Sequence, residues 1–240
     1  MKKKIVILGS TGSIGKTLIS ILDKDKKNIE IILLTTNKNI KLLLKQVKKF
    51  DVKNIIITNK KKYLIIKEKL KNKKINIYDN FNSINKILKK KKIDYSINAI
   101  SGIAGLDPTL KIIKFTKCIA IANKEAIICG WTLIKKELKK NKTKFIPIDS
   151  EHFSIWSLIN KAKDSDIEKV FITASGGPFH KYPLNKFKSI TKKLALKHPN
   201  WKMGKKITID SATMMNKVFE IMEAKKIFDI DYKKLSILVH

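Results

Sequence analysis

The chain has 240 residues, of which 43% are hydrophobic, enough to bury a core in one large domain or two small ones. Its formal net charge of +33 comes from 53 basic residues, every one a lysine, against 20 acidic residues. Clustered cations would indicate a nucleic-acid surface, because they release counterions from phosphates. The lysines are instead spread along the chain, and arginine, which reads guanine edges best, does not occur. The composition therefore favours a lysine-enriched globular protein that attracts anionic small molecules and binds no nucleic acid.

The sequence also argues against a membrane protein. No apolar run reaches the length of a bilayer-spanning helix, and the short apolar run near the N-terminus leads into a glycine-rich turn. Cys118 and Cys129 lie in apolar segments, which predicts buried free thiols in a reducing cytoplasm. We therefore expect a cytoplasmic protein that contacts no membrane.

Strand-like and helix-like segments alternate through the first half of the chain. Short apolar, β-branched runs predict strands, which lie at residues 3–10, 28–36, 52–59, 74–79, 93–100 and 118–124. Segments with helical spacing lie between them, at residues 15–25, 39–50, 61–72, 81–92 and 106–117. This alternation predicts an α/β fold with a Rossmann-like, doubly wound parallel sheet whose two faces are both covered.

The pattern changes after about residue 145, where glycine, serine, histidine and tryptophan gather in clusters. A strand entering a tight turn is predicted at 169–179, and a final strand at 234–240. The strongest helix is predicted at 208–228, with Asp210 or Ser211 as its N-cap. We therefore place a domain boundary near residue 148, with a Rossmann-like domain at 1–148 and an α+β domain at 149–240.

The stretch "GSTGSIG" places Gly9, Gly12 and Gly15 between the first strand and the first helix. Glycines at this position allow a tight turn and let a dinucleotide pyrophosphate approach the helix N-terminus. The second strand ends in "TTNKN", without the acidic residue that would hold an NAD ribose. Lys38 there fits the 2′-phosphate of NADPH. The alternative is a plain strand-to-helix turn.

Two further stretches follow strands and carry charge. In "ANKEA", Lys124 and Glu125 lie where strand ends face the ligand crevice, and the alternative is a solvated ion pair at a helix start. In "IPIDSE", strand alternation would put Asp149 and Glu151 on one face and Ser150 on the other. Paired carboxylates suit Mg²⁺ or Mn²⁺, and the alternative is a helix N-terminus that carries acids and a cap.

The long helix supplies a third carboxylate. Asn216 and Glu220 share one face at i and i+4, and Lys217 lies beside Glu220 at i+3. The helix could thus hold a phosphate and reach a metal, and Ser211 and Ser175 of "ASGGPF" add hydroxyls. The alternative is a salt bridge on a solvated face.

The loop "KHPNWKMGKK" carries one tryptophan, Trp201, among proline, asparagine and glycine. Such a loop is a candidate lid that excludes water from a site. The alternative is a tryptophan packed on the domain surface.

Together these stretches resemble the 1-deoxy-D-xylulose 5-phosphate reductoisomerase family. The similar motifs are "GSTGSIG", "ANKE", "DSEH", "ASGGPF", "HPNW-MG-K" and "DSATMMNK", which occur in order over nearly the whole chain. The resemblance implies an NADPH-dependent oxidoreductase and isomerase that requires Mn²⁺ or Mg²⁺. Its reaction would convert 1-deoxy-D-xylulose 5-phosphate to 2-C-methyl-D-erythritol 4-phosphate, the second step of non-mevalonate isoprenoid biosynthesis. It also implies a homodimer.

The resemblance assigns roles by motif position. The implied metal ligands are Asp149, Glu151 and Glu220. The implied catalytic residues are Lys124, Glu151, His198 and Trp201. The implied substrate-binding residues are Lys124, Ser150, Glu151, Ser175, His198, Ser211, Asn216, Lys217 and Glu220. The implied cofactor-binding residues are Thr11, Gly12, Ser13, Ile14, Lys38, Asn39, Asn123, Glu125 and Gly204. His152 matches no ligand and is expected to be structural.

The sequence departs from the family in a few residues and in length. Asn37, Phe153, His180 and Val218 stand where the family commonly has other residues, but none replaces an implied ligand. The family continues for well over a hundred residues, so the resemblance implies a catalytic domain that is cut short and a missing C-terminal helical domain. The activity of these 240 residues is therefore left open. The alternatives are an inactive sugar-phosphate binder of the same family, a metal-independent NADPH dehydrogenase and a basic nucleic-acid-binding protein.

Overall fold

The computed structural model describes residues 1–89, 91–159, 166–199 and 204–239. Contacts between Cα atoms divide the chain into two compact units, Met1–Asp149 and Ser150–His240. Among the helices in the described ranges, none combines the length and the apolar character needed to cross a bilayer.

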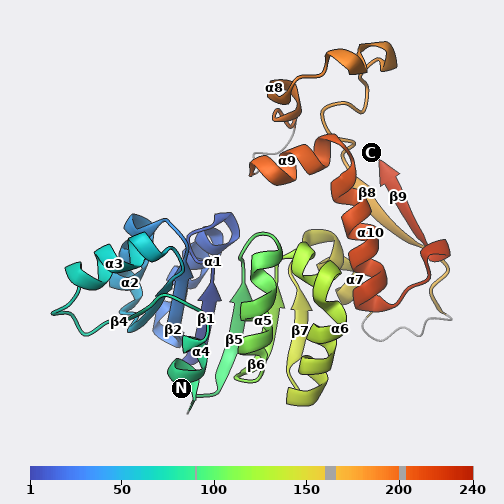
Figure 1. Cartoon of the computed structure of the whole chain (residues 1–240). Coiled ribbons are helices and arrows are strands. Elements are labelled where there is room, and N and C mark those ends of the chain that lie inside the picture. The colour runs from blue at the N-terminus through green and yellow to red at the C-terminus, as the bar shows by residue number, and fades with distance from the viewer. Residues whose placement is uncertain (90, 160–165, 200–203, 240) are drawn as a thin grey trace. The chain divides into compact units, whose positions relative to one another are not determined.

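A parallel sheet forms the centre of the first unit (Figure 1). Its described strands are β1 (Lys3–Leu8), β2 (Ile29–Thr36), β3 (Asn54–Ile57), β4 (Asn76–Tyr78), β5 (Ile93–Asn98), β6 (Thr116–Ile121) and β7 (Lys144–Pro147). They lie in the order β4-β3-β2-β1-β5-β6-β7, and each neighbouring pair is parallel. The chain therefore reverses its direction of winding between β1 and β5, as a doubly wound sheet does. The predicted α/β fold class is confirmed.

Helices connect these strands. They are α1 (Ser13–Lys24), α2 (Ile40–Phe50), α3 (Lys60–Lys69), α4 (Ser83–Leu88), α5 (Leu106–Ile113) and α6 (Lys124–Asn141). The predicted helix at 106–117 is four residues too long. Thr116 already belongs to β6, because it pairs with Ile93 of β5 and its hydroxyl lies 2.7 Å from that of Ser96.

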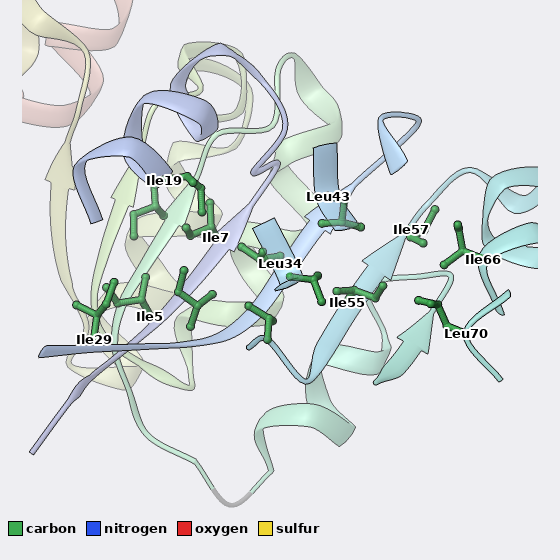
Figure 2. Packing of buried hydrophobic residues seen from close by; sticks show 14 residues of the cluster. Ile5, Ile7, Ile19, Ile29, Leu34, Leu43, Ile55, Ile57, Ile66 and Leu70 are labelled. Carbon is green, nitrogen blue, oxygen red and sulfur yellow. The ribbon is translucent and has the colours of Figure 1, made fainter. Parts of the chain in front are cut away.

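The core of the first unit explains the apolar strands. Ile5 and Ile7 of β1 belong to a cluster of buried side chains that extends to Ile19 of α1, Leu43 of α2 and Ile66 of α3 (Figure 2). The intervening β1 residues, Val6 and Leu8, point to the opposite face and are equally inaccessible to solvent. Both faces of the sheet are therefore covered, and the sequence shows continuous apolar runs instead of alternation.

Only one of the two cysteines is buried as predicted. Cys118 of β6 is buried, whereas Cys129 of α6 is exposed. The buried positions of α6 include Ala126, Gly130 and Ile134, which repeat every fourth residue along one face. Position 129 falls outside that stripe, so an apolar neighbourhood in sequence did not mean burial.

The second unit contains α7 (Ser150–Ile159), β8 (Val170–Ala174), α8 (Lys192–Ala195), α9 (Lys205–Ala212), α10 (Met215–Phe228) and β9 (Leu235–Val239). Strands β8 and β9 form a parallel pair, with Val170 opposite Leu235 (Figure 1). A small core joins α7, α10 and this pair, and its buried members are Ile155, Ile172, Ala224, Ile230 and Leu235.

Two sequence predictions fail in this unit. Strand β7 ends at Pro147 and α7 begins at Ser150, so the strand alternation proposed for "IPIDSE" does not occur, and Glu151 lies on a helix. The predicted helix 208–228 is two helices, α9 and α10, separated at Met214, whose φ of 59° is left-handed. Helix α9 begins at Lys205, so Asp210 and Ser211 lie inside it and cap nothing at its start.

Candidate functional site

The glycine turn between β1 and α1 is tightly packed against backbone. Gly9 has a φ of +80°, and a Cβ there would lie 2.9 Å from the carbonyl oxygen of Ala99. A Cβ on Gly15 would lie 2.5 Å from the carbonyl oxygen of Gly9. At Gly12, the N-cap of α1, the nearest such contact is 3.5 Å. Two of the three glycines are therefore required by close approach, and no side chain in this described segment caps the first turn of α1.

Residues at the end of β2 hold this turn in place. The amide of Gly9 donates to the hydroxyl of Thr35 over 2.8 Å, and the hydroxyls of Thr11 and Thr36 lie 2.6 Å apart. The side chain of Gln46 donates to the Ser10 carbonyl oxygen over 2.9 Å. The sequence reasoning missed Thr35, Thr36 and Gln46, because their contacts cross 25 to 36 positions of the chain.

Residues 37–39 follow β2, and they include the two predicted cofactor residues Lys38 and Asn39. Asn39 accepts a hydrogen bond from the Leu42 amide over 3.2 Å and so caps α2. Asn37 donates to the hydroxyl of Thr58, while Lys38 is exposed. Among the three, Lys38 is the one whose charge is presented to solvent.

Asn123 is the N-cap of α6. Its side-chain oxygen accepts from the Ala126 amide over 2.9 Å, and its nitrogen donates to the Gly102 carbonyl oxygen over 2.5 Å and to that of Ile100. This places Lys124 in the first turn of α6, where its side chain is 10% exposed and its ammonium lies 3.2 Å from the Asp149 carboxylate. Lys124 thus pairs with Asp149, and this pair is largely buried, unlike the solvated ion pair that was the alternative for this stretch.

In the second unit, Lys217 lies among carbonyl and carboxylate oxygens. Its ammonium is 2.9 Å from an oxygen of Glu151 and 2.6 Å from the Thr173 carbonyl oxygen, and it also pairs with Glu220. Asn216 donates to the other oxygen of Glu220, as the i and i+4 spacing predicts. The Lys217 and Glu220 side chains are 8% and 2% exposed, so the alternative of a solvated salt bridge is wrong.

Glu151 borders a groove between α7 and β8. The groove has a volume of about 770 Å³, and its lining includes Glu151, Ser154, Val170 and Thr173. Because Glu151 lies in the first turn of α7 and Glu220 lies on α10, two helices of this unit direct carboxylates at the same ammonium.

His152 and Glu223 lie next to this cluster. Both side chains are almost inaccessible to solvent, at 0% and 2% exposure. One ring nitrogen of His152 is 2.9 Å from the Glu220 carbonyl oxygen, and the other is 3.5 Å from the Glu223 carboxylate. Sequence reasoning gave Glu223 no role, although it stands one helical turn after Glu220.

The loop after β8 brings two predicted substrate residues together. The hydroxyl of Ser175 is 3.4 Å from Nε2 of His198. Gly177, with a φ of +69°, has no room for a Cβ, which would lie 2.6 Å from the Ser211 carbonyl oxygen. The loop is thus in close contact with α9 near Ser211.

The remaining predicted residues are placed as follows. Ser13 and Ile14 open α1 and are exposed, and Glu125 lies in the first turn of α6. Ser150 is exposed and its hydroxyl bonds to Glu151. Gly204 precedes α9 as its N-cap. Trp201, the candidate lid residue, lies outside the described residues.

Comparison with protein families gives two matches. Residues 5–130 match the family described as 1-deoxy-D-xylulose 5-phosphate reductoisomerase, and residues 145–228 match its C-terminal domain. A curated relative from Pelagibacter ubique (strain HTCC1062), named 1-deoxy-D-xylulose 5-phosphate reductoisomerase, is 64% identical over 99% of this chain and 62% of its own length. One of the same name from Bacteroides thetaiotaomicron is 41% identical over 100% of this chain and 61% of its own length. The chain thus spans somewhat under two thirds of these relatives.

Solved structures agree. The reductoisomerase of Zymomonas mobilis in complex with NADPH superposes with a TM-score of 0.89 at 33% identity, over 100% of this chain and 62% of that one. A reductoisomerase in complex with NADPH, fosmidomycin and magnesium gives a TM-score of 0.88 at 32% identity, over 99% and 61%. The first family match alone covers more than half of the sequence. The chain therefore belongs to the 1-deoxy-D-xylulose 5-phosphate reductoisomerase family.

Proposed function

We propose that this chain carries the NADPH- and divalent-metal-binding parts of an enzyme that converts 1-deoxy-D-xylulose 5-phosphate to 2-C-methyl-D-erythritol 4-phosphate. The observation that carries the proposal is the convergence of Glu151 and Glu220 on Lys217, inside a family whose solved members bind NADPH and magnesium. The same two carboxylates are implied as metal ligands, and the same lysine as a phosphate ligand, by the sequence motifs.

The glycine turn fits a dinucleotide. A side chain at Gly9 or Gly15 would fill the space in which the backbone turns toward α1, and no side chain occupies the cap of that helix in the described segment. Helix N-termini and exposed amides favour a pyrophosphate. Thr11, Gly12, Ser13 and Ile14 would contact NADPH, and Lys38 would face its 2′-phosphate, with Asn39, Asn123, Glu125 and Gly204 nearby. For Asn39 and Asn123, their capping bonds indicate that they act by fixing the helix ends.

The carboxylates fit a hard divalent cation. Glu151 and Glu220 direct oxygens at one positive charge, which is the donor set that Mg²⁺ and Mn²⁺ prefer. We propose Asp149, two residues before Glu151 in the chain, as the third ligand. A bound metal would act as a Lewis acid on the substrate oxygens and so stabilise developing negative charge.

Substrate phosphate would be bound near the N-terminus of α10. The break at Met214 puts Asn216 and Lys217 in the first turn of that helix, where backbone amides and the helix dipole favour an anion. Ser175 and Ser211 would add hydroxyl donors. Binding energy from this remote group can be used to orient the reacting carbons.

The other residues would act closer to the chemistry. Lys124, held near Asp149, and Ser150 would contact the polar end of the substrate, and His198 would lie beside it. Trp201 would close over the carbon chain. NADPH would supply the hydride that reduces the rearranged aldehyde. We further propose a cytoplasmic homodimer.

Metal-dependent NADPH oxidation tests the proposal. Absorbance of NADPH should fall when 1-deoxy-D-xylulose 5-phosphate and Mn²⁺ are both present, and should stay constant without metal. Glu220→Gln should abolish this turnover by removing a ligand charge, while Glu30→Gln, the same change at an exposed site on β2, should leave it intact. Turnover that survives Glu220→Gln would refute the metal assignment, and metal-independent oxidation would favour a plain dehydrogenase.

One further result would identify the sugar-phosphate binder. Retained binding of Mn²⁺ and of the sugar phosphate, without NADPH oxidation, would show that these 240 residues form the sites but do not complete the reaction.

A further inference from the structure

The buried pair His152 and Glu223 has no role in the function proposed above. His152 is completely inaccessible to solvent, and its ring is stacked on that of Phe228, with centroids 6.4 Å apart and planes 10° apart. Burying a histidine and a carboxylate costs free energy unless both are hydrogen-bonded or paired. An apolar side chain could fill the same space without this cost, so packing alone does not explain why a histidine and a carboxylate are buried here.

The contacts of His152 define the orientation of its ring. Nε2 lies 2.9 Å from the carbonyl oxygen of Glu220. Because a carbonyl oxygen only accepts, Nε2 carries the hydrogen and donates it. Nδ1 then faces the carboxylate of Glu223 at 3.5 Å, one helical turn beyond Glu220. The Glu220 carbonyl oxygen therefore holds the ring on one side by a hydrogen bond, and the Glu223 carboxylate faces it on the other side.

The hydrogen bond of His152 affects the positions of two carboxylates next to this pair, those of Glu151 and Glu220. Glu151 immediately precedes His152 on α7, and Glu220 is the residue whose carbonyl oxygen accepts the hydrogen bond. A hydrogen bond has a preferred distance and angle, so this one restrains how α7 and α10 can shift against each other at this point. The bond thus limits how far the backbone that carries Glu151 can move from the backbone that carries Glu220.

We propose that His152 is a positioning residue that fixes the Glu151 and Glu220 carboxylates in a geometry suited to one divalent cation, with Glu223 orienting its ring. This inference rests on the metal role in the proposed function. Groups that orient metal ligands through hydrogen bonds commonly change metal affinity by about 10- to 100-fold when they are removed.

Mn²⁺ affinity, measured from the electron paramagnetic resonance signal of the free ion, tests the inference in the full 240-residue chain. Glu223→Gln keeps the size of the side chain and removes its charge, and should raise the Kd for Mn²⁺ several-fold. His152→Leu removes both polar contacts and should raise it about 10-fold or more. His152→Gln can place an amide N–H near the position of Nε2, and should recover most of the affinity lost in His152→Leu.

A matched control separates positioning from stability. Ile155 is buried on the same helix and packs in the core of this unit. Ile155→Val should lower the thermal midpoint by an amount comparable to Glu223→Gln and leave the Kd for Mn²⁺ unchanged. Thermal midpoints of all variants show which of them remain folded. If His152→Leu does not fold, the Kd values of Glu223→Gln and His152→Gln test the positioning role.

The outcomes distinguish the inference from the proposed function. A Kd that is unchanged in folded His152→Leu or Glu223→Gln, or that rises equally in Ile155→Val, overturns the positioning role while the metal site stands. Failure of the unchanged chain to bind Mn²⁺ overturns the metal assignment and the positioning role together.

Discussion

Replacing Gly15 by alanine separates two opposite expectations for the glycine turn. Gly15 lies inside α1, and alanine is favoured over glycine in a helix by about 1 kcal/mol. Helix propensity alone therefore predicts a more stable protein. The structure predicts the reverse, because the added Cβ would lie 2.5 Å from the Gly9 carbonyl oxygen and 2.6 Å from the carbonyl carbon of Ser10.

The magnitude follows from these distances. Carbon atoms in favourable contact are about 3.5–4.0 Å apart, so the turn or the helix must move by roughly 1 Å. The opposing atoms are backbone, and the turn is held by the Gly9 amide bond to Thr35 and by the Gln46 bond to Ser10. Overpacking a rigid site costs about 1–3 kcal/mol, and more where backbone must shift. We expect Gly15→Ala to lower the free energy of unfolding by about 2 kcal/mol after the propensity gain.

The assay must report on the first unit alone. Trp131 lies in α6, with its ring 5.1 Å from that of Phe145, and replacing Trp156 and Trp201 by phenylalanine leaves it as the single tryptophan. Urea unfolding followed by its fluorescence then measures the effect of each variant. Gly12→Ala is the control within the same motif. Its nearest contact is an ordinary 3.5 Å, so its cost should stay below about 1 kcal/mol, that of a poorer N-cap.

Gly15→Ala should also weaken NADPH binding, measured by the change in NADPH fluorescence, since the turn must move. A Gly15→Ala variant as stable as the unchanged chain would refute the reasoning, because it would show that the turn relaxes freely around the new methyl group. Equal losses of unfolding free energy in Gly15→Ala and Gly12→Ala would show that the cost does not come from the close approach of the Gly9 carbonyl oxygen to residue 15.

Two other predictions concern titratable groups in the first unit. The hydrogen bonds from the Lys117 side chain and from the Lys4 amide hold the pKa of Asp94 below its usual value. The Asp94 carboxylate therefore stabilises the folded chain above about pH 4, and this stabilisation is lost as the pH falls through the lower pKa of the folded state. At pH 7, Asp94→Asn should therefore lower the urea midpoint, which corresponds to a loss of less than about 1 kcal/mol in the free energy of unfolding, and in strong acid it should have no effect. An equal loss at both pH values would contradict this prediction. Burial raises the pKa of the Cys118 thiol, whereas Cys129 is exposed. Iodoacetamide should therefore label Cys129 in the native chain and Cys118 only after unfolding, and peptide mass spectrometry measures the labelling at each site. Equal labelling rates in the native chain would refute that assignment.

The parallel sheet was predictable because its causes are local. Apolar runs of four to eight residues, each followed by a segment with helical spacing, leave few arrangements other than a sheet covered on both faces. The glycine turn was predictable for the same reason, since Gly9 and Gly15 mark backbone that no side chain can approach.

The break between α9 and α10 was not predictable from local signals. Neither glycine nor proline occurs in 208–228, and the left-handed residue is Met214, for which this conformation is uncommon. Its consequence is functional in the proposed site, because only the break places Asn216 and Lys217 in a first helical turn. Strand alternation failed at Glu151 because Pro147 ends the pairing of β7 with β6 three residues before α7 begins.

The large number of lysines makes the two site lysines hard to recognise in the sequence, whereas their burial in the structure distinguishes them. By composition the 53 lysines are equivalent, and their number first pointed to a surface property of the whole chain. Among the described residues, Lys124 and Lys217 are the two lysines that are buried. A buried ammonium requires negative partners, and these two find them in Asp149 for the first and in Glu151 and Glu220 for the second. The carboxylates that balance the two buried lysines are the three that the family motifs imply as metal ligands. A surface enriched in lysine can change without disturbing those pairs, whereas exchanging either buried lysine for a neutral residue would remove a positive charge that balances those carboxylates.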